Sequence, residues 1–356
     1  MKETKKFEII ECKGTPYEIG VQWGKGCKEN ILKAMEITFG GLSQGYGTTK
    51  EDIISNAMKY GKKVQNFDHE LFDMLKGQSE GAGVKFEEIF ALKCAYDLAA
   101  YYKQLTALCT SFAARGVATQ KGNTFLGQTI DWYPGTPMDL LKITYPDGTV
   151  NLSLVLWGVV EYTLNSAGFG MCANGTWSTS DDFHFNIPLG CYLPKAMRQQ
   201  TWEDALEILR KNARGLGYFL LASKNGEITG IESVQNDFEN HYPEEDILVH
   251  SNHYLTERFQ DMDLVNTLVP DSPSRLERIK ILVENHYGYL TPQLMMEIMA
   301  DHENYPNSIC RHIDETKPPQ FHSQTLAAYI MVPEEGIIYI ARGNPCQHEF
   351  VEYTMD

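Results

Sequence analysis

The chain has 356 residues, of which 43% are hydrophobic and 22% are charged, a composition typical of a globular protein that buries a sizeable core. Its 47 acidic residues outnumber its 31 lysines and arginines, which gives a formal net charge of −16. Such a surface does not offer the dense positive field that nucleic acids and anionic membranes require. We therefore expect neither of them as a partner.

The N-terminal residues do not resemble a secretory signal. The basic start is followed by Phe7-Glu8-Ile9-Ile10-Glu11, which is too short and too acidic for the apolar region of a signal peptide. The longest apolar runs, Leu154–Val160 and Ala327–Val332, have the length of buried strands and fall far short of the roughly 20 residues that cross a bilayer. These features predict a cytoplasmic protein.

The cysteines and histidines form no recognisable metal-binding pattern. The chain has no C-x-x-C pair and no zinc-ribbon spacing, so its eight cysteines are expected to be free thiols: Cys12, Cys27, Cys94, Cys109, Cys172, Cys191, Cys310 and Cys346. Four histidines, His250, His253, His302 and His312, could be assembled into a metal site, but isolated histidines are more often structural. We predict no metal and no cofactor.

The first hundred residues are predicted to be helical. An amphipathic stretch begins at Thr15 and runs to Met35, Thr49 begins a second with a capping-box pattern, and Lys85–Gln104 is a third. Glycine-rich breaks at Gly40-Gly41 and Gly81-Ala82-Gly83 are expected to separate these helices.

From Cys109 onward the sequence changes to short β-rich runs. Strands are predicted at Phe112–Thr119, Thr124–Ile130, Leu141–Tyr145 and Thr149–Trp157. Lys121-Gly122-Asn123 and Pro146-Asp147-Gly148 suit tight turns, because glycine and asparagine adopt positive φ at low cost. We expect this segment to be a meander.

The remainder alternates between the two kinds of element. Helices are predicted to begin at Thr201, Ser272 and Thr291, and hairpins to form from Tyr218–Ser223 with Glu227–Val234 and from Thr325–Val332 with Ile337–Ala341. The chain has no repeat of fixed period and no low-complexity linker. We therefore predict a helical N-terminal part packed on one α+β core, with the junction near Cys109.

Cys109 stands at that junction, and its place suggests a specific chemistry. A chain cut directly before Cys109 would carry a thiol and a free α-amine on one residue. Because an α-amine has a pKa near 8, it can accept the thiol proton at neutral pH and take the part that histidine plays in a catalytic triad. The alternative from position alone is a buried, inert cysteine.

Five segments of the chain together resemble one known family. They are Cys109-Thr110-Ser111, Gly127-Gln128-Thr129-Ile130-Asp131-Trp132, Asn165-Ser166-Ala167-Gly168, His250-Ser251-Asn252-His253 and Glu303-Asn304-Tyr305-Pro306-Asn307-Ser308-Ile309-Cys310-Arg311. In order and approximate spacing they resemble the acyl-coenzyme A:6-aminopenicillanic acid acyltransferase family, also called isopenicillin-N acyltransferase-like or C45 peptidases. The resemblance extends from Cys109 to the C-terminus.

The resemblance implies an N-terminal nucleophile hydrolase with a four-layer αββα sandwich, made as a precursor that cleaves itself before the nucleophile. The scissile bond would be Leu108–Cys109, which divides the chain into a helical segment 1–108 and a catalytic core 109–356 that stay associated. The family commonly has glycine before its nucleophile, and glycine eases distortion of the scissile peptide. Leu108 at this position points to slow processing, or to none.

The resemblance also assigns roles to four further residues. Asp131 matches an acidic residue that holds the new ammonium group or a substrate amine, and Asn252 matches the asparagine of the oxyanion hole. Ser308 and Arg311 belong to a block that lines the substrate site, with Arg311 a partner for Asp131 or for a substrate carboxylate.

Three interpretations of function follow. The first is an amide hydrolase or acyltransferase that acts on a small N-acylated amine through a Cys109 thioester, with an acyl-coenzyme A as one candidate donor. The second is an amidase of the bile-salt hydrolase and penicillin V acylase kind. The third is a non-catalytic binding protein of the same fold, uncut before Cys109. The sequence leaves open whether the protein forms a homo-oligomer.

Overall fold

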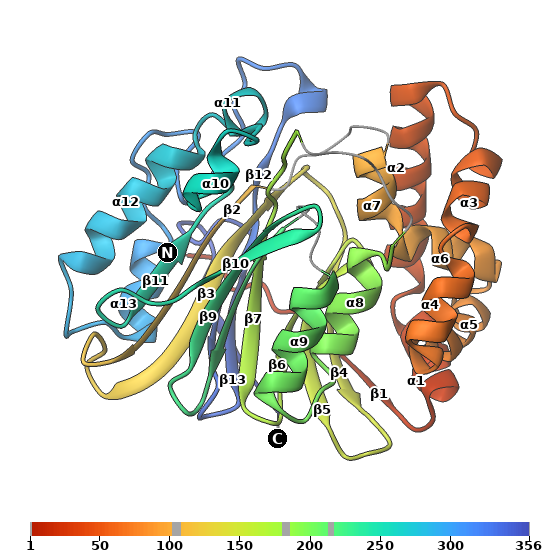
Figure 1. Ribbon diagram of the computed structural model, residues 1–356, viewed down its shortest axis with the longest axis horizontal. Coiled ribbons are helices and arrows are strands. Elements are labelled where there is room, and N and C mark those ends of the chain that lie inside the picture. Colours follow the sequence, from red (N-terminus) through yellow and green to blue (C-terminus); the bar gives the residue numbers. More distant parts are fainter. Residues whose placement is uncertain (1, 102–107, 180–185, 213–216, 356) are drawn as a thin grey trace.

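The computed structural model describes residues 2–101, 108–179, 186–212 and 217–355, and in it two β-sheets pack face to face between layers of helices (Figure 1). The eight-stranded sheet has the order β1 (Ile9–Lys13), β4 (Met138–Thr144), β5 (Val150–Leu156), β6 (Val160–Asn165), β7 (Phe169–Asn174), β8 (Tyr218–Ser223), β9 (Ile228–Val234), β10 (Asp237–His241). The six-stranded sheet has the order β11 (Ile247–His250), β2 (Leu108–Gly116), β3 (Gly122–Trp132), β12 (Gln324–Val332), β13 (Ile337–Arg342), β14 (Val351–Thr354).

Helices cover the outer face of each sheet. Those on the side of the eight-stranded sheet are α1 (Pro16–Gly26), α2 (Lys28–Tyr46), α3 (Lys50–Met58), α4 (Gly61–Phe67), α5 (His69–Ala82), α6 (Phe86–Lys93), α7 (Ala95–Tyr101), α8 (Leu189–Ala196) and α9 (Trp202–Asn212). The six-stranded sheet is covered by α12 (Ser272–Glu284) and α13 (Pro292–Ile298), and the short helices α10 (Glu257–Gln260), α11 (Val265–Leu268) and the 3₁₀ turn η1 (Pro319–Phe321) lie in connecting segments. The predicted α+β class and αββα layering are confirmed.

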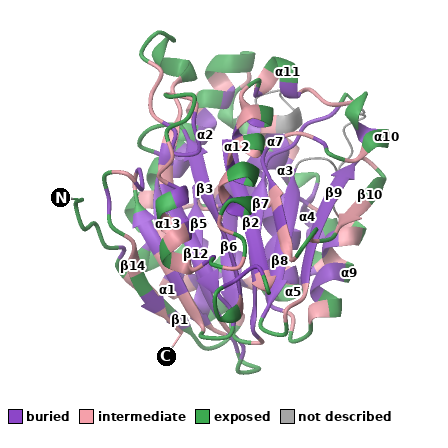
Figure 2. Ribbon diagram, turned by 90° about the vertical axis from the view of Figure 1, so that its left-hand side faces the viewer, coloured by how far each residue is buried: buried purple, intermediate pink, exposed green. Residues whose placement is uncertain are grey.

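The central strands of the two sheets are buried on both faces, as Figure 2 shows. Successive side chains of a strand point to opposite faces. In β2, Ala113 belongs to the core between the sheets, whereas Phe112 and Ala114 pack with Ile279 of α12 and Met295 of α13. The chain therefore builds two apolar layers against the six-stranded sheet, one on each face.

Local signals in the sequence correctly located several element boundaries. Thr15 and Thr49 each cap a helix with a complete capping box, and the Thr201 hydroxyl accepts a hydrogen bond from the Asp204 backbone N–H at 3.2 Å. Gly122 and Gly226 adopt positive φ in the predicted hairpin turns. These signals succeed because each depends on residues within about four positions of one another.

Three helix predictions are wrong. The expected break at Gly40-Gly41 lies inside α2, whose buried face continues through Phe39 and Leu42, so burial of that face outweighs the low helix propensity of two glycines. The single stretch expected from Thr15 to Met35 is two helices that meet at Cys27. The third predicted helix, Lys85–Gln104, is also two helices, α6 and α7, which meet at Cys94, and its residues 102–104 lie outside the described residues.

The predicted meander is divided between the two sheets. β2 and β3 form a hairpin in the six-stranded sheet, whereas β4 and the strands that follow it to β10 form an antiparallel meander in the other sheet. The strand β1, which the sequence analysis did not predict, pairs in parallel with β4 at the edge of that sheet. Periodicity indicates a strand but does not indicate its partner, because pairing depends on distant residues.

Helices α1 and α5 cross in close backbone contact through glycines. A methyl group on Gly20 would lie 1.9 Å from the backbone oxygen of Met74, and one on Gly77 would lie 2.0 Å from the backbone oxygen of Tyr17. Both glycines are buried. A side chain at either position would force the two helices apart.

Gly20→Ala is therefore expected to lower the free energy of unfolding by about 1–3 kcal/mol through overpacking. Gly40→Ala is the matched control, because a methyl group there meets nothing within 4 Å and alanine in a helix interior is favoured over glycine by about 0.5–1 kcal/mol. Thermal unfolding should show a lower Tm for the first variant and an equal or higher Tm for the second. A lower Tm of similar size in both would contradict the proposed helix contact.

Candidate active site

Cys109 is the second residue of β2, and its thiol lies in the core region between the two sheets. The residue is 2% exposed, and it interacts electrostatically with Tyr162 of β6 and Cys172 of β7 in the opposite sheet. Burial raises the pKa of the Cys109 thiol to about 12, and the negative charge of Asp131 acts in the same direction. In the intact chain the thiol is therefore protonated at neutral pH and needs a base before it can attack a carbonyl.

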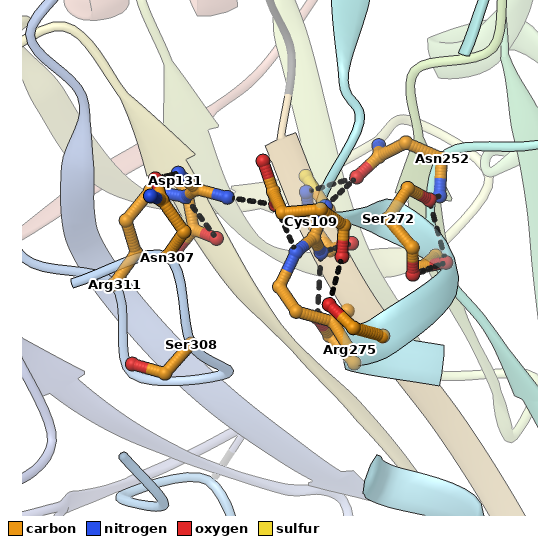
Figure 3. Close-up of polar contacts among 12 residues, drawn as sticks. Cys109, Asp131, Asn252, Ser272, Arg275, Asn307, Ser308 and Arg311 are labelled. Carbon is orange, nitrogen blue, oxygen red and sulfur yellow. Dashed lines mark hydrogen bonds and ion pairs between the residues drawn. The ribbon is translucent and has the colours of Figure 1, made fainter. Parts of the chain in front are cut away.

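Two side chains hold the main chain of Cys109 from one side (Figure 3). The backbone N–H of Cys109 donates to Asn252 Oδ1 at 2.9 Å. The guanidinium of Arg275 donates to the Cys109 carbonyl oxygen at 2.6 Å and to Asn252 Oδ1 at 2.8 Å. All three residues are 2% exposed or less, so these polar contacts form in a region of low dielectric where they are strong.

The loop after β11 and the first turn of α12 fix the orientation of Asn252. The Asn252 backbone N–H donates to Ser272 Oγ at 2.7 Å, and Asn252 Nδ2 donates to the Gly175 carbonyl oxygen at 3.0 Å. Because Oδ1 receives two donors and Nδ2 faces a carbonyl, the amide can have only one orientation. The acceptor end of the side chain is thus directed at the nitrogen of Cys109.

Asp131 lies at the end of β3, opposite Leu108 in the strand register. Its Oδ1 accepts from Thr325 Oγ1 at 2.7 Å, and its Oδ2 lies 3.7 Å from Arg311 Nε. Among the described residues Oδ2 has no hydrogen-bond partner, although the atom is buried. Burial raises the pKa of Asp131 to about 6, against the opposing effect of the positive charges of Arg311 and Arg275.

Asp271 connects the two arginines of the site. One of its carboxylate oxygens, Oδ2, accepts from Arg275 Nε at 2.7 Å and also from Arg311. Burial alone would raise the pKa of Asp271, but the two guanidinium groups lower it below its usual value. Two carboxyl groups and two guanidinium groups therefore surround the start of β2, so when both carboxyls are ionised the formal charges balance.

The remaining predicted site residues differ in their distance from this network. Arg311 also donates to Asn307 Oδ1 at 2.6 Å, so it is held by residues of its own loop as well as by Asp271. Ser308 lies on the far side of that loop (Figure 3), and its hydroxyl donates to the Cys310 carbonyl oxygen at 2.7 Å. Leu108 is buried beside Cys109 in β2. The structure thus brings Cys109, Asn252, Asp131 and Arg311 together and leaves Ser308 apart.

Sequence reasoning missed Arg275, Asp271 and Ser272 as site residues. The pair Ser272-Pro273 indicates only the start of a helix, and Arg275 follows Asp271 by four residues, the spacing of an ion pair along a helix. That signal is present in the sequence but is common on exposed helices. Only the fold shows that the first turn of α12 points at the backbone of Cys109.

The four histidines that the sequence analysis considered together lie in two places. His250 is fully buried, stacks on Tyr218 with ring centroids 3.5 Å apart, and has Nε2 3.1 Å from Glu232 Oε1. His302 and His312 lie next to each other in the loop that carries Arg311, with their Nε2 atoms 3.1 Å apart. The four therefore do not form one site.

The chain is similar in sequence to a known protein family and to a protein of the same description. Residues 196–347 match the sequence profile of the family described as acyl-coenzyme A:6-aminopenicillanic acid acyl-transferase. The chain is 24% identical over 319 residues to the 40 kDa form of the acyl-coenzyme A:6-aminopenicillanic-acid-acyltransferase of Emericella nidulans, which covers 86% of this chain and 85% of that protein.

Two solved structures are also similar to this chain. A mutant of the conjugated bile acid hydrolase from Clostridium perfringens matches with a TM-score of 0.44 and 13% identity over 69% of this chain and 96% of that one. The penicillin V acylase from Agrobacterium tumefaciens matches with a TM-score of 0.46 and 13% identity over 66% of this chain and 83% of that one.

The described part of our chain contains no helix with the length and hydrophobicity of a membrane span.

Proposed function

Because this chain is a relative of the acyl-coenzyme A:6-aminopenicillanic acid acyltransferase family, we propose that it is a self-processing cysteine N-terminal nucleophile enzyme. Its reaction is the cleavage or transfer of the acyl group of a small N-acylated amine. The observation that carries the proposal is the environment of Cys109, whose backbone nitrogen and oxygen are held by Asn252 and Arg275. An enzyme that uses the amine of its nucleophile as a base must hold that nitrogen firmly.

The first proposed reaction takes place within the chain itself. The Cys109 sulfur attacks the Leu108 carbonyl carbon, the peptide C–N bond breaks, and a thioester forms while the Cys109 nitrogen becomes a free amine. Water then hydrolyses the thioester and leaves the Leu108 carboxylate and the Cys109 thiol. The deep burial of the thiol supports self-cleavage before any reaction with a substrate. The Leu108 carbonyl is an acyl group on the adjacent residue and is already within reach of the thiol.

Asp131 is the residue we propose as the base for this step. Its carboxyl group is close enough to raise the pKa of the Cys109 thiol, after the larger effect of burial, and its Oδ2 has no hydrogen-bond partner among the described residues. With a pKa of about 6, it is ionised at neutral pH. In the cleaved enzyme the same carboxylate would hold the new ammonium group of Cys109 or a substrate amine.

In the cleaved enzyme the α-amine of Cys109 accepts the thiol proton, and the sulfur attacks the acyl carbon of the substrate. The α-ammonium group then gives its proton to the substrate nitrogen, the C–N bond breaks, and the amine leaves. The resulting thioester passes its acyl group to water or to a second amine. In the intact chain Asn252 Nδ2 donates to the Gly175 carbonyl oxygen, so the oxyanion-hole role that the resemblance assigns to Asn252 requires this amide to turn toward the substrate after cleavage. Arg311 is the group that we assign to a substrate carboxylate. Hydrolysis and acyl transfer share the thioester and differ only in the acceptor. An acyl-coenzyme A, as in the name of the fungal relative, would enter as an alternative acyl donor.

The two fragments are expected to remain together after cleavage. The strand β1 of the N-terminal fragment pairs with β4 of the other over five residues. Lys93 donates to Glu161 at 2.5 Å, and both side chains are no more than 3% exposed. Separation would break this ion pair and would expose the apolar helical face that covers the larger sheet.

Intact mass under denaturing conditions tests the proposal on freshly purified protein. We expect two species, residues 1–108 and residues 109–356, and a single full-length species for Cys109→Ala. Cys172→Ala is the matched control, since Cys172 is a second fully buried thiol between the same two sheets, and it should be cleaved like the wild type. A single full-length wild-type species would favour the binding-protein interpretation, in which Cys109 remains internal.

A further inference from the structure

A second group of reactive side chains lies on the far side of the loop that carries Arg311. His302, Cys310 and His312 belong to the segment between α13 and η1, and Cys346 follows β13. Each offers one ligand atom, and these four atoms all lie within 4.8 Å of one another. The chain thus brings two thiols and two imidazoles together from positions up to 44 residues apart.

The three distances from His312 Nε2 to the other ligand atoms are close to the edges of a tetrahedral metal site, and all six distances are within 4.8 Å. Zn–N and Zn–S bonds of about 2.0–2.1 and 2.3 Å imply ligand separations of about 3.3 Å between two nitrogens and about 3.6 Å between nitrogen and sulfur. The Nε2 atoms of His302 and His312 are 3.1 Å apart. His312 Nε2 lies 3.7 Å from Cys310 Sγ and 3.4 Å from Cys346 Sγ.

The side-chain amide of Asn344 lies where hydrogen-bond donors lie around metal-bound thiolates. Asn344 Nδ2 is directed at Cys310 Sγ at 3.6 Å and also donates to the Arg311 carbonyl oxygen at 2.6 Å. Hydrogen bonds of this kind stabilise a thiolate ligand and orient it. Cys310 is fully buried, whereas the His302 side chain is exposed, so a cation could enter from the side of His302.

We propose that His302, Cys310, His312 and Cys346 form a structural site for Zn²⁺ or a divalent ion of similar preference. All four positions are filled by protein atoms, which is the pattern of a structural site and not of a catalytic one. The site joins the loop of Arg311 to the segment after β13. Because Arg311 stands between the ligands Cys310 and His312, the bound ion also fixes the backbone from which Arg311 reaches Asp131 and Asp271.

The test uses the full chain with two probes, zinc content and cobalt binding. We expect one Zn²⁺ per chain by elemental analysis after purification with added zinc. After zinc removal, Co²⁺ should give the intense visible bands of a tetrahedral ion and the ultraviolet thiolate-to-metal band. Cys310→Ser and Cys346→Ser should each weaken Co²⁺ binding by at least about 10–100-fold. His322→Ala and Cys191→Ser are the matched controls outside the cluster, and both should bind as the wild type does.

Three results would overturn the site: less than a tenth of an ion per wild-type chain, a cobalt spectrum without the thiolate band, or ligand variants that bind like the wild type. A Cys310–Cys346 disulfide in the protein as purified, detected by mass before and after reduction, would also overturn it. The wild-type spectrum decides the question even if a ligand variant does not fold. The result is independent of the cleavage at Leu108–Cys109, which the intact mass of the two fragments reports separately.

Discussion

Cys109→Ala is expected to reduce turnover of N-acylated amines by on the order of 10⁴-fold or more, since it removes the nucleophile and also prevents release of the α-amine. The polar contacts of this residue with Asn252 and Arg275 use its backbone nitrogen and oxygen. Alanine keeps both, so the variant should fold with a Tm near that of the wild type. Release of the free amine from a panel of aliphatic and aromatic N-acyl amines would measure the loss.

Two controls separate loss of chemistry from loss of structure. Cys172→Ala removes a thiol from the same inter-sheet core and should keep turnover within a few-fold of the wild type. During turnover, the wild-type fragment 109–356 should gain the mass of the acyl group, and the gain should map to Cys109. Turnover by Cys109→Ala at a rate near that of the wild type would exclude the thioester mechanism.

Asp131→Asn is expected to slow self-cleavage at pH 7–8 by about 10²-fold or more, the usual contribution of a general base. Burial raises the pKa of Asp131 to about 6, so the carboxyl group is neutral below that pH and ionised above it. The wild-type cleavage rate should therefore rise as the pH increases through 6 and then level off. Asparagine can still accept the hydrogen bond from Thr325 but cannot take a proton.

The rate can be followed on precursor that is isolated unfolded from inclusion bodies in urea, by refolding it into buffers between pH 5 and pH 8 and measuring the full-length species over time. Asp139→Asn is the matched control, because burial also raises the pKa of that carboxyl group but it lies in β4 and bonds to Asn30. It should be cleaved at the wild-type rate. Cleavage that is independent of pH, or an Asp131→Asn variant as fast as the wild type, would assign the base to another group.

Much of the local structure followed from short-range chemistry. The helix start at Thr15, the capping box at Thr49 and the hairpin turns at Gly122 and Gly226 were all predicted where the structure has them. Each depends on hydrogen bonds or backbone angles among residues close in sequence, so a single sequence contains the information. The break at Gly40-Gly41 was wrong because burial of one helix face, a tertiary effect, prevailed over local propensity.

The candidate site also contains residues that the sequence could predict and residues that it could not. Cys109, Asp131, Asn252 and Arg311 were proposed from motifs and a family resemblance, and the structure places them around the start of β2. The resemblance carried information on distant residues that local patterns lack. Arg275 and Asp271 were missed because their helix-start pattern is common, and nothing in it indicates which backbone the helix faces.

The sequence by itself determined the type and approximate limits of the elements with clear caps, turns or periodicity, the acidic character of the chain and the candidate nucleophile. Only the tertiary structure decided which sheet each strand joins, which charges surround Cys109, and that Cys346 lies beside His312. The physical reason is the separation along the chain of the groups that interact. Caps and turns are formed by groups a few residues apart, whereas strand pairing, buried ion pairs and ligand clusters depend on contacts between residues tens to hundreds of positions apart, which only the packed fold brings together.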